Sequence, residues 1–141
     1  MNHSRQLNNR INSLHERAMR LVYKDFTSSF TQLLEKDNSV TIHQRNLQNL
    51  ALEVFKVKNN LAPEVMKEVF VTKDSHYDLR NKTDFKLYKV RTVSYGTETI
   101  STLGPKIWNL LPSEIVTAPT YSIFHKRLKD FNLYTVVYLL F

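Results

Sequence analysis

The stretch Thr41–Asn60, TIHQRNLQNLALEVFKVKNN, decides the fold class of this 141-residue chain. Its apolar residues recur with the i, i+3, i+4, i+7, i+8 spacing of one helix face, at Leu47, Leu50, Ala51, Val54 and Phe55. Thr41 and Gln44 have the spacing of a capping box, so the helix is expected to begin there. Asparagine tolerates the left-handed conformation that ends helices, and Asn59 and Asn60 therefore mark the C-terminal end.

Helical signals continue on both sides of this stretch. Upstream, apolar residues alternate steps of four and three, which predicts one apolar stripe on a helix of about twenty residues: Leu7, Ile11, Leu14, Ala18 and Leu21. Ser29 with Gln32 predicts a second capping box and a short helix that ends near Asp37 and Asn38. Downstream, Pro63 suits the first turn of another short helix, PEVMKEVF.

The pattern changes after Val71. The segment 71–97 is polar, rich in Tyr and Thr and only partly alternating, so we expect a long loop with one or two short strands near Phe85–Leu87 and Val90–Val93. Helical spacing resumes in TISTLGPKIWNLLP and in PTYSIFHKRLKDF, and Trp108 is expected to be buried beside Ile107 and Leu111. The predicted fold is mainly α: an irregular helical bundle of about six helices with a short two-stranded β element or a long loop in the middle.

Both glycines of the chain, Gly96 and Gly104, lie within nine residues of each other. One interpretation is a phosphate-binding loop, in which glycines before a helix let backbone N–H groups approach an anion. Pro105 follows Gly104, however, and lacks the N–H that such a loop would use. We therefore favour structural turns, with Pro105 at the first position of a helix.

Length and composition indicate a single helical domain over residues 1–130, followed by an apolar C-terminal tail over 131–141. The tail, FNLYTVVYLLF, can be a strand, a docked segment or foreign sequence. No signal peptide is evident, and no apolar run approaches the roughly 18 residues that cross a bilayer. Cysteine is absent, which excludes disulfides and thiolate zinc sites. We expect an intracellular protein, nuclear or cytoplasmic, with no membrane partner.

Basic residues outnumber acidic ones. Twenty Lys and Arg against thirteen Asp and Glu give a formal net charge of +7, which suits nucleic acid or another anionic surface but also an ordinary soluble basic domain. Three cations, Arg10, Arg17 and Lys24, are spaced seven residues apart and are expected on one face of the first helix. They are candidates for nucleic-acid contact, and a solvated helix face is the alternative.

A second candidate site lies in RNKTDFKLYKVR, where aromatic residues alternate with cations. Cations neutralise phosphates while exposed rings stack on bases, so the mixture suits single-stranded RNA or DNA. Its candidate binding residues are Arg80, Lys82, Lys86, Tyr88, Lys89 and Arg91. In the alternative interpretation, Phe85 and Tyr88 lie in the core and the lysines are merely solvated.

No catalytic site is evident. Two-metal nucleotidyl transfer needs carboxylates that converge on the cations, and the sequence has no adjacent Asp pair, no HExxH and no GxSxG. The five histidines are scattered without a paired ligand spacing. We expect no enzyme activity, no metal site and no cofactor.

An ordered series of motifs resembles a known family. LHERAMRLVY, SVTIHQRNLQ, ALEVFKVKN, YDLRN and LGPKIWNLLP occur in this order. Together they resemble the region that follows the reverse transcriptase domain in jockey-like and related non-LTR retrotransposon polyproteins. The similarity extends over nearly everything up to about Asp130.

The resemblance implies a thumb-like segment downstream of the polymerase palm, helping to hold RNA template, primer or target DNA during target-primed reverse transcription. The catalytic aspartates of such an RNA-directed DNA polymerase would belong to the palm, the partner domain in full-length relatives. Relatives typically continue into a cysteine-rich motif similar to a zinc knuckle, whereas this sequence has no cysteine. The alternative is an inert or protein-interacting helical domain whose charge only solubilises it.

Overall fold

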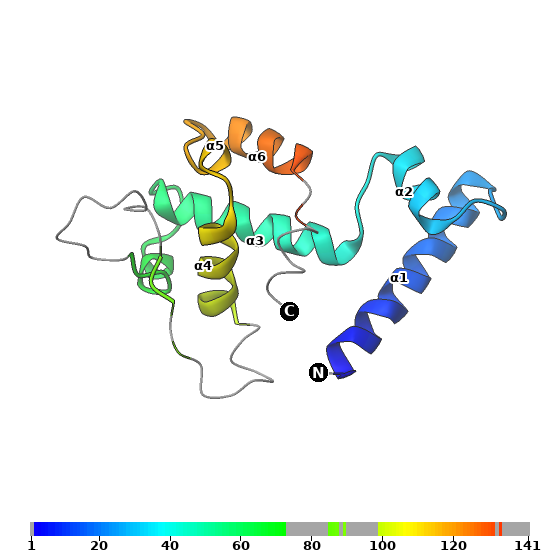
Figure 1. Ribbon diagram of the computed structural model, residues 1–141, viewed down its shortest axis with the longest axis horizontal. Coiled ribbons are helices and arrows are strands. Elements are labelled where there is room, and N and C mark those ends of the chain that lie inside the picture. Colours follow the sequence, from blue (N-terminus) through cyan, green and yellow to red (C-terminus); the bar gives the residue numbers. More distant parts are fainter. Residues whose placement is uncertain (1, 73–84, 88, 90–98, 132, 134–141) are drawn as a thin grey trace. The chain divides into compact units, whose positions relative to one another are not determined.

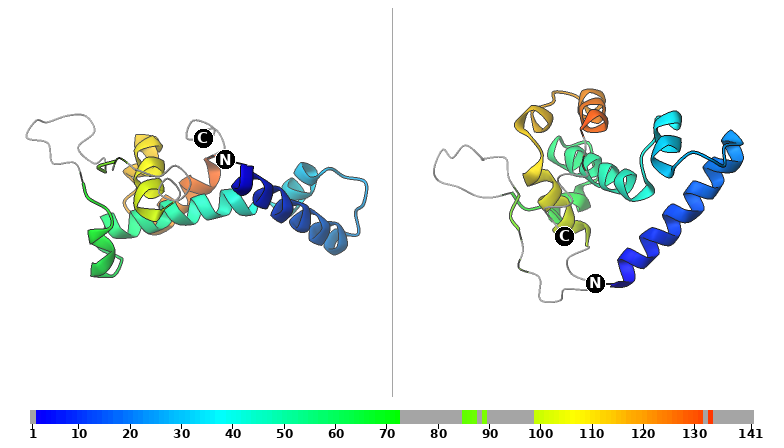
Figure 2. Two further views of the ribbon diagram at one scale, coloured as in Figure 1. Left: turned by 90° about the horizontal axis from the view of Figure 1, so that it is seen from below. Right: turned by 45° about the vertical axis from the view of Figure 1, so that its right-hand side comes forward.

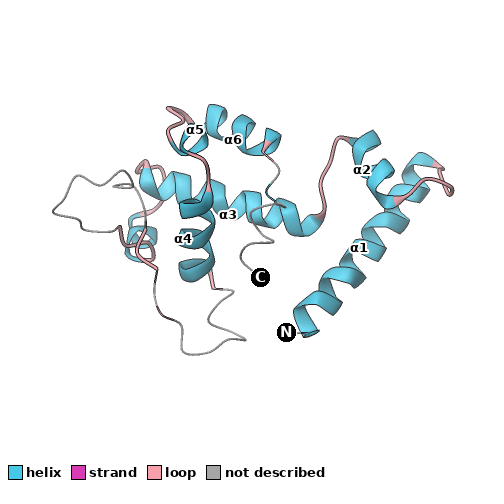
Figure 3. Cartoon of the chain, viewed as in Figure 1, coloured by secondary structure: helices cyan, strands magenta, loops and turns pink. Residues whose placement is uncertain are grey.

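The computed structural model describes residues 2–72, 85–87, 89, 99–131 and 133 (Figure 1). The elements in these ranges are the helices α1 (Asn2–Tyr23), α2 (Phe30–Asp37), α3 (Ile42–Lys58), α4 (Ile100–Leu110), α5 (Ser113–Val116) and α6 (Tyr121–Asp130), with the 3₁₀-helix η1 (Glu64–Glu68) after α3. Figure 3 shows helices and loops but no strand in the described part of the chain. The prediction of a mainly helical fold is confirmed. None of the described helices has both the length and the apolar character needed to cross a membrane.

Capping boxes begin α2 and α3, as the sequence predicts. The Ser29 hydroxyl accepts from the Gln32 N–H at 3.3 Å, and the Gln32 side-chain oxygen accepts from the Ser29 N–H at 2.8 Å. Thr41 and Gln44 form the same reciprocal pair, with distances of 3.2 and 3.3 Å. A left-handed asparagine follows each of the two helices: Asn38, with φ 50°, and Asn60, with φ 57°.

Two short helical elements each follow a proline. The predicted short helix at Pro63 is the 3₁₀-helix η1, with Pro63 immediately before it. The single turn α5 follows Pro112 and was not predicted. Proline suits the start of a helix because the N–H that it lacks would have no partner in the helix and because its φ is already close to the helical value.

The chain falls into two compact units, Met1–Asn46 and Leu47–Phe141, where composition indicated one domain through residue 130. In the first unit, α2 folds back on the C-terminal part of α1 (Figure 2). Its small core consists of Met19, Leu33 and Leu34. The His15 ring meets the Phe30 ring edge-on, with centroids 5.5 Å apart. The Tyr23 hydroxyl donates to the Asp37 carboxylate at 2.5 Å.

The apolar stripe of α1 is a different face from the one that packs against α2. The five stripe residues are all exposed: Leu7, Ile11, Leu14, Ala18 and Leu21. The face toward α2 carries His15, Met19 and Tyr23 at four-residue steps. At 100° per residue, the centres of the two faces are about 120° apart around the helix. Within the first unit, α2 therefore does not cover the apolar stripe.

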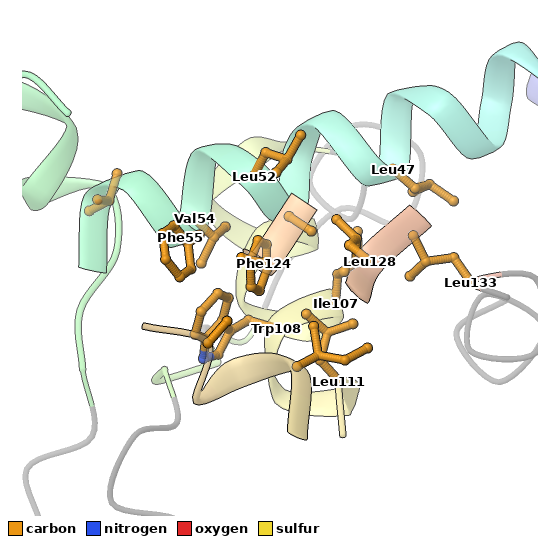
Figure 4. Packing of buried hydrophobic residues seen from close by; sticks show 14 of the residues in the cluster. Leu47, Leu52, Val54, Phe55, Ile107, Trp108, Leu111, Phe124, Leu128 and Leu133 are labelled. Atoms are coloured by element: carbon orange, nitrogen blue, oxygen red, sulfur yellow. The ribbon is translucent and has the colours of Figure 1, made fainter. Parts of the chain in front are cut away.

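The core of the second unit is formed by α3, α4 and α6, with further residues from the intervening segments (Figure 4). Five aromatic rings lie in series through it: Phe70 to Phe85 at 5.8 Å, Phe85 to Trp108 at 5.9 Å, Trp108 to Phe124 at 5.7 Å, and Phe124 to Phe55 at 4.4 Å between centroids. Trp108 is buried in the same cluster as Ile107 and Leu111, which confirms the prediction for the indole. Leu133, from the predicted apolar tail, is also buried there.

The predicted turn at Gly104 is wrong. Gly104 lies within α4, and Pro105 is the sixth residue of that helix rather than its first. Gly104 is buried, and a β-carbon added to it would lie 2.7 Å from Phe70 Cε1 and 3.0 Å from Val54 Cγ2. The glycine is thus explained by close packing of α4 against these two side chains. Gly96 lies outside the described residues.

The predicted strand at Phe85–Leu87 is reduced to one isolated antiparallel bridge between Thr72 and Phe85. The bridge is made by the Lys86 N–H, which donates to the Val71 carbonyl at 2.8 Å. The Asn109 side chain of α4 binds Phe85 itself: it donates to the Phe85 carbonyl at 3.0 Å and accepts from the Phe85 N–H at 2.9 Å. The strand predicted at 90–93 lies outside the described residues.

Candidate nucleic-acid interface

Two of the three cations predicted to lie together on the first helix do so. Arg10 and Arg17 are exposed and lie seven residues apart on α1. Lys24 lies just beyond the end of the helix, in a left-handed conformation with φ 52°. Arg20 lies nearby but forms an ion pair with Glu16 at 2.7 Å. The predicted group of three is therefore a pair of arginines on the helix and a lysine in the following turn.

Two of the six candidate residues in the segment 80–91 belong to the described part of the second unit. Lys86 and Lys89 are exposed there. Arg80, Lys82, Tyr88 and Arg91 lie outside the described residues. The arginine pair of α1 belongs to the first unit, so the two predicted clusters belong to different compact units.

The ring of Phe85 belongs to the core, as in the alternative interpretation of that segment. It is 1% exposed and lies between Phe70 and Trp108. A ring enclosed in this way cannot stack on a base without leaving the core. The aromatic contribution to a nucleic-acid site must therefore come from other residues.

Helix α6 carries the densest group of cations in the described chain. Its buried residues Phe124 and Leu128 attach the helix to the core. The remaining side chains between 125 and 129 are basic and exposed: His125, Lys126, Arg127 and Lys129. Asp130 is the one acidic residue of the helix. The surface of α6 away from the core is thus strongly basic.

An exposed pair of rings lies on the same helix. Tyr121 and His125 are one turn apart, with ring centroids separated by 6.2 Å and ring planes inclined by 6°. Both residues are exposed. The Tyr121 ring also meets the buried Phe55 ring at 6.4 Å, so it continues the aromatic series of the core to the surface.

Lys56 of α3 joins this ring pair from a neighbouring helix. Its Nζ lies 5.5 Å from the centroid of the Tyr121 ring, within the range of a cation–π contact. A hydrogen bond to the Glu53 carboxylate, 2.7 Å away, raises the pKa of Lys56, so the ammonium group stays charged. Glu53 also offsets part of its charge. Lys126 and Lys129, by contrast, form no ion pair with any described residue.

These residues form one surface of the second unit. Tyr121, His125 and Lys129 follow four-residue steps along one edge of α6, with Lys126 on the adjoining side, because the helix advances 100° per residue. We call the set Lys56, Tyr121, His125, Lys126 and Lys129 the α6 surface. It combines two lysines that form no ion pair with a described residue, two exposed and nearly parallel rings, and a third cation beside one of them.

The α6 surface was not predicted from the sequence. Only the apolar spacing of this helix entered the prediction, although the run HKRLK at 125–129 is a visible basic signal. The contact between Lys56 and Tyr121 cannot be predicted from neighbouring residues in the sequence, because it depends on how α3 and α6 pack. A helical projection of the basic run would have found the lysines but not that contact.

No group of His, Asp and Glu in the described ranges is arranged to hold a metal ion. Comparison of the chain with protein-family models, with curated proteins and with solved structures gave no match. The resemblance to retrotransposon polyproteins therefore remains a prediction from the sequence motifs.

Proposed function

We propose that this chain is a non-catalytic nucleic-acid-binding helical segment and that single-stranded RNA or DNA binds across the α6 surface. The observation that carries the proposal is the exposed ring pair of Tyr121 and His125 beside Lys126 and Lys129. Lysines neutralise backbone phosphates, and flat exposed rings stack on bases. The net charge of +7 supports the same class of partner.

Single strands fit this surface better than a duplex does. A duplex keeps its bases stacked inside, whereas a single strand can place a base on the Tyr121 ring while its phosphates reach the lysines. Every base has a π face, so the binding is expected to depend little on sequence. Specificity would come from other parts of a larger protein.

The biological setting we propose is the one that the motif resemblance implies. In it, the chain is an accessory segment of a non-LTR retrotransposon reverse transcriptase and helps to hold template, primer or target DNA. The polymerase reaction itself would depend on a palm domain with its own catalytic aspartates. Primer extension with this chain alone is accordingly expected to yield no product.

The test is the salt dependence of binding between the full chain and a fluorescent oligouridine, followed by anisotropy. Each phosphate contact with a single strand contributes about −0.7 to the slope of log K against log salt concentration. The double variant Lys126→Ser/Lys129→Ser should therefore flatten the slope by about 1.4 if both lysines contact phosphate.

A matched control removes the same charge elsewhere. Lys36 and Lys67 are exposed lysines that already form ion pairs, with Asp25 at 3.7 Å and Glu64 at 3.6 Å. The variant Lys36→Ser/Lys67→Ser should leave the slope nearly unchanged. Equal effects of the two double variants would mean that net charge alone attracts the oligonucleotide, and absence of binding would favour the inert helical domain.

Stacking is tested separately at Tyr121. Tyr121→Ala should weaken binding by about 1 to 3 kcal/mol, the usual contribution of one stacked base. The Tyr121 ring also contacts Phe55, so its removal can disturb the core as well as the binding surface. Tyr121→Phe is the control, because it keeps the aromatic ring and should bind almost normally. Loss of binding in Tyr121→Phe would assign the role to the hydroxyl and contradict stacking.

A further inference from the structure

The exposed apolar stripe of α1 belongs to the first unit, whereas the α6 surface belongs to the second. We call its five residues the α1 seam: Leu7, Ile11, Leu14, Ala18 and Leu21. Leu14 is 64% exposed and Leu21 is 69% exposed. Val22, in the last turn of the helix, and Phe26, just beyond its C-terminal end, are exposed apolar residues as well. Soluble domains rarely leave a continuous apolar surface of this kind without a partner.

The spacing of the seam identifies a helix as the partner. Steps of four and three alternate without interruption from residue 7 to residue 21, which is the pattern of a two-stranded coiled coil. With 22 residues, α1 is about 33 Å long at 1.5 Å per residue, enough for three heptads. An extended strand or a loop would not match a stripe that follows the helix axis.

The two edges of the seam differ. On one edge, His15 and Met19 contact residues of α2. On the opposite edge lie Arg10 and Arg17, at the positions that flank a coiled-coil seam and select its partner. Glu16, the one acidic residue of α1, is already paired with Arg20 at 2.7 Å. The open edge of the seam is therefore purely cationic.

Charge argues against a second copy of this chain as the partner. In a parallel pair of α1 helices, the flanking positions would place Arg10 opposite His15 and Arg17 opposite Val22, without an acidic residue in either contact. In an antiparallel pair, the arginine edges would face each other and repel. A complementary helix must bring its own carboxylates.

We propose that the α1 seam binds an amphipathic α-helix of a partner protein, one that has apolar residues in its own seam and Glu or Asp along the edge facing Arg10 and Arg17. Apolar contacts would supply most of the binding free energy, and the ion pairs would set partner choice and orientation. The partner is a different class of molecule from the nucleic acid proposed for the α6 surface, so the two proposals can fail independently.

The experiment uses the full chain and two designed helical peptides of three heptads. Both have an Ile and Leu seam, and the flanking positions are Glu in one peptide and Lys in the other. We expect the Glu peptide to bind about tenfold more tightly than the Lys peptide. The Glu side chains attract Arg10 and Arg17, whereas Lys side chains at the same positions repel them, and the small differences at the individual pairs add up. Arg10→Ser/Arg17→Ser should abolish this preference.

The control Lys36→Ser/Arg45→Ser removes two exposed cations of the same unit that are not on the seam, and it should keep the preference. Leu14→Asp should prevent binding of the Glu peptide, while circular dichroism shows an unchanged helix content because position 14 is exposed. Equal affinity for the two peptides, or no binding of either, would overturn the proposal.

Two further outcomes would also overturn it. Dimerisation of the chain that Leu14→Asp abolishes, measured by sedimentation equilibrium, would make a second copy the occupant. A clear fall in the melting temperature of Leu14→Asp without any peptide would mean that another part of the same chain covers the seam. Both measurements are made without RNA, so neither depends on the function of the α6 surface.

Discussion

Gly104 lies so close to Phe70 that a β-carbon on the glycine would stand 2.7 Å from Cε1 of the phenyl ring. The same β-carbon would lie 3.0 Å from Val54 Cγ2. Both side chains are buried, so neither can swing into solvent to make room. Glycine at this position therefore allows the helix α4 to approach α3 and the segment after η1.

Gly104→Ala should destabilise the chain despite its position inside a helix. Alanine gains about 1 kcal/mol of helix propensity over glycine, but overpacking of a filled core costs about 1 to 3 kcal/mol. Urea unfolding followed by circular dichroism measures the difference. In the Phe70→Leu background the cost of Gly104→Ala should shrink, and a net gain in stability from Gly104→Ala alone would contradict the packing argument.

Asn109→Ala should release Phe85 from α4. The Asn109 side chain bonds both backbone groups of Phe85, at 2.9 and 3.0 Å, and an unpaired buried polar group costs about 1 to 3 kcal/mol. Hydrogen exchange at the Phe85 amide should accelerate in the variant. As a control, Asn59→Ala removes one local bond to the Phe55 carbonyl and should leave the Phe85 amide protected. Unchanged protection in Asn109→Ala would show that the ring alone holds the segment.

Ser29→Ala and Thr41→Ala should each cost about 0.5 to 2 kcal/mol of stability, the usual price of losing an N-cap. Thermal unfolding followed at the helical circular dichroism band provides the measurement. Thr31→Ala is the matched control, because this exposed threonine lies inside α2 rather than at its cap. An equal loss of stability in Thr31→Ala would mean that the replacement by alanine itself, and not the loss of the cap, destabilises the protein.

The carboxyl group of Asp25 should titrate well below the usual range for aspartate. A hydrogen bond from the Ser28 hydroxyl, together with bonds from the backbone N–H groups of Ser28 and Thr27, lowers its pKa. Because the folded pKa lies below the unfolded value of about 3.9, these bonds stabilise the α1–α2 connection above that pH and are lost as the pH falls toward the folded pKa.

The amide chemical shifts of Thr27 and Ser28, recorded against pH, report this titration locally. Local shifts are preferable to global stability because a hydrogen bond from Tyr23 also lowers the pKa of Asp37. Asp25→Asn should remove the pH dependence of the two amides at low pH. A midpoint near the ordinary aspartate value would show that the bonds seen here do not persist in solution.

Local signals predicted the elements well. The capping residues Ser29 and Thr41 and the left-handed Asn60 act within a few residues of themselves, so their chemistry can be read directly from the sequence. The burial of Trp108 followed from the apolar spacing around it. Propensity and periodicity are sufficient where neighbours along the chain decide the outcome.

Tertiary packing decided the features that sequence analysis missed. A Gly–Pro pair usually indicates a turn, and only the approach of Phe70 and Val54 explains a glycine inside α4. The exposed seam of α1 could not be distinguished from a buried stripe by its spacing, because both share the same period. The α6 surface depends on Lys56 reaching Tyr121 from another helix.

The most direct test of the proposed function is a ¹H–¹⁵N NMR titration of the full chain with unlabelled oligouridine. We expect chemical-shift changes centred on Tyr121, His125, Lys126 and Lys129, with a smaller change at Lys56, and these changes should reverse when salt is added. Changes confined to the first unit around Arg10 and Arg17, or no changes with a saturating oligonucleotide, would contradict the assignment of nucleic-acid binding to the α6 surface.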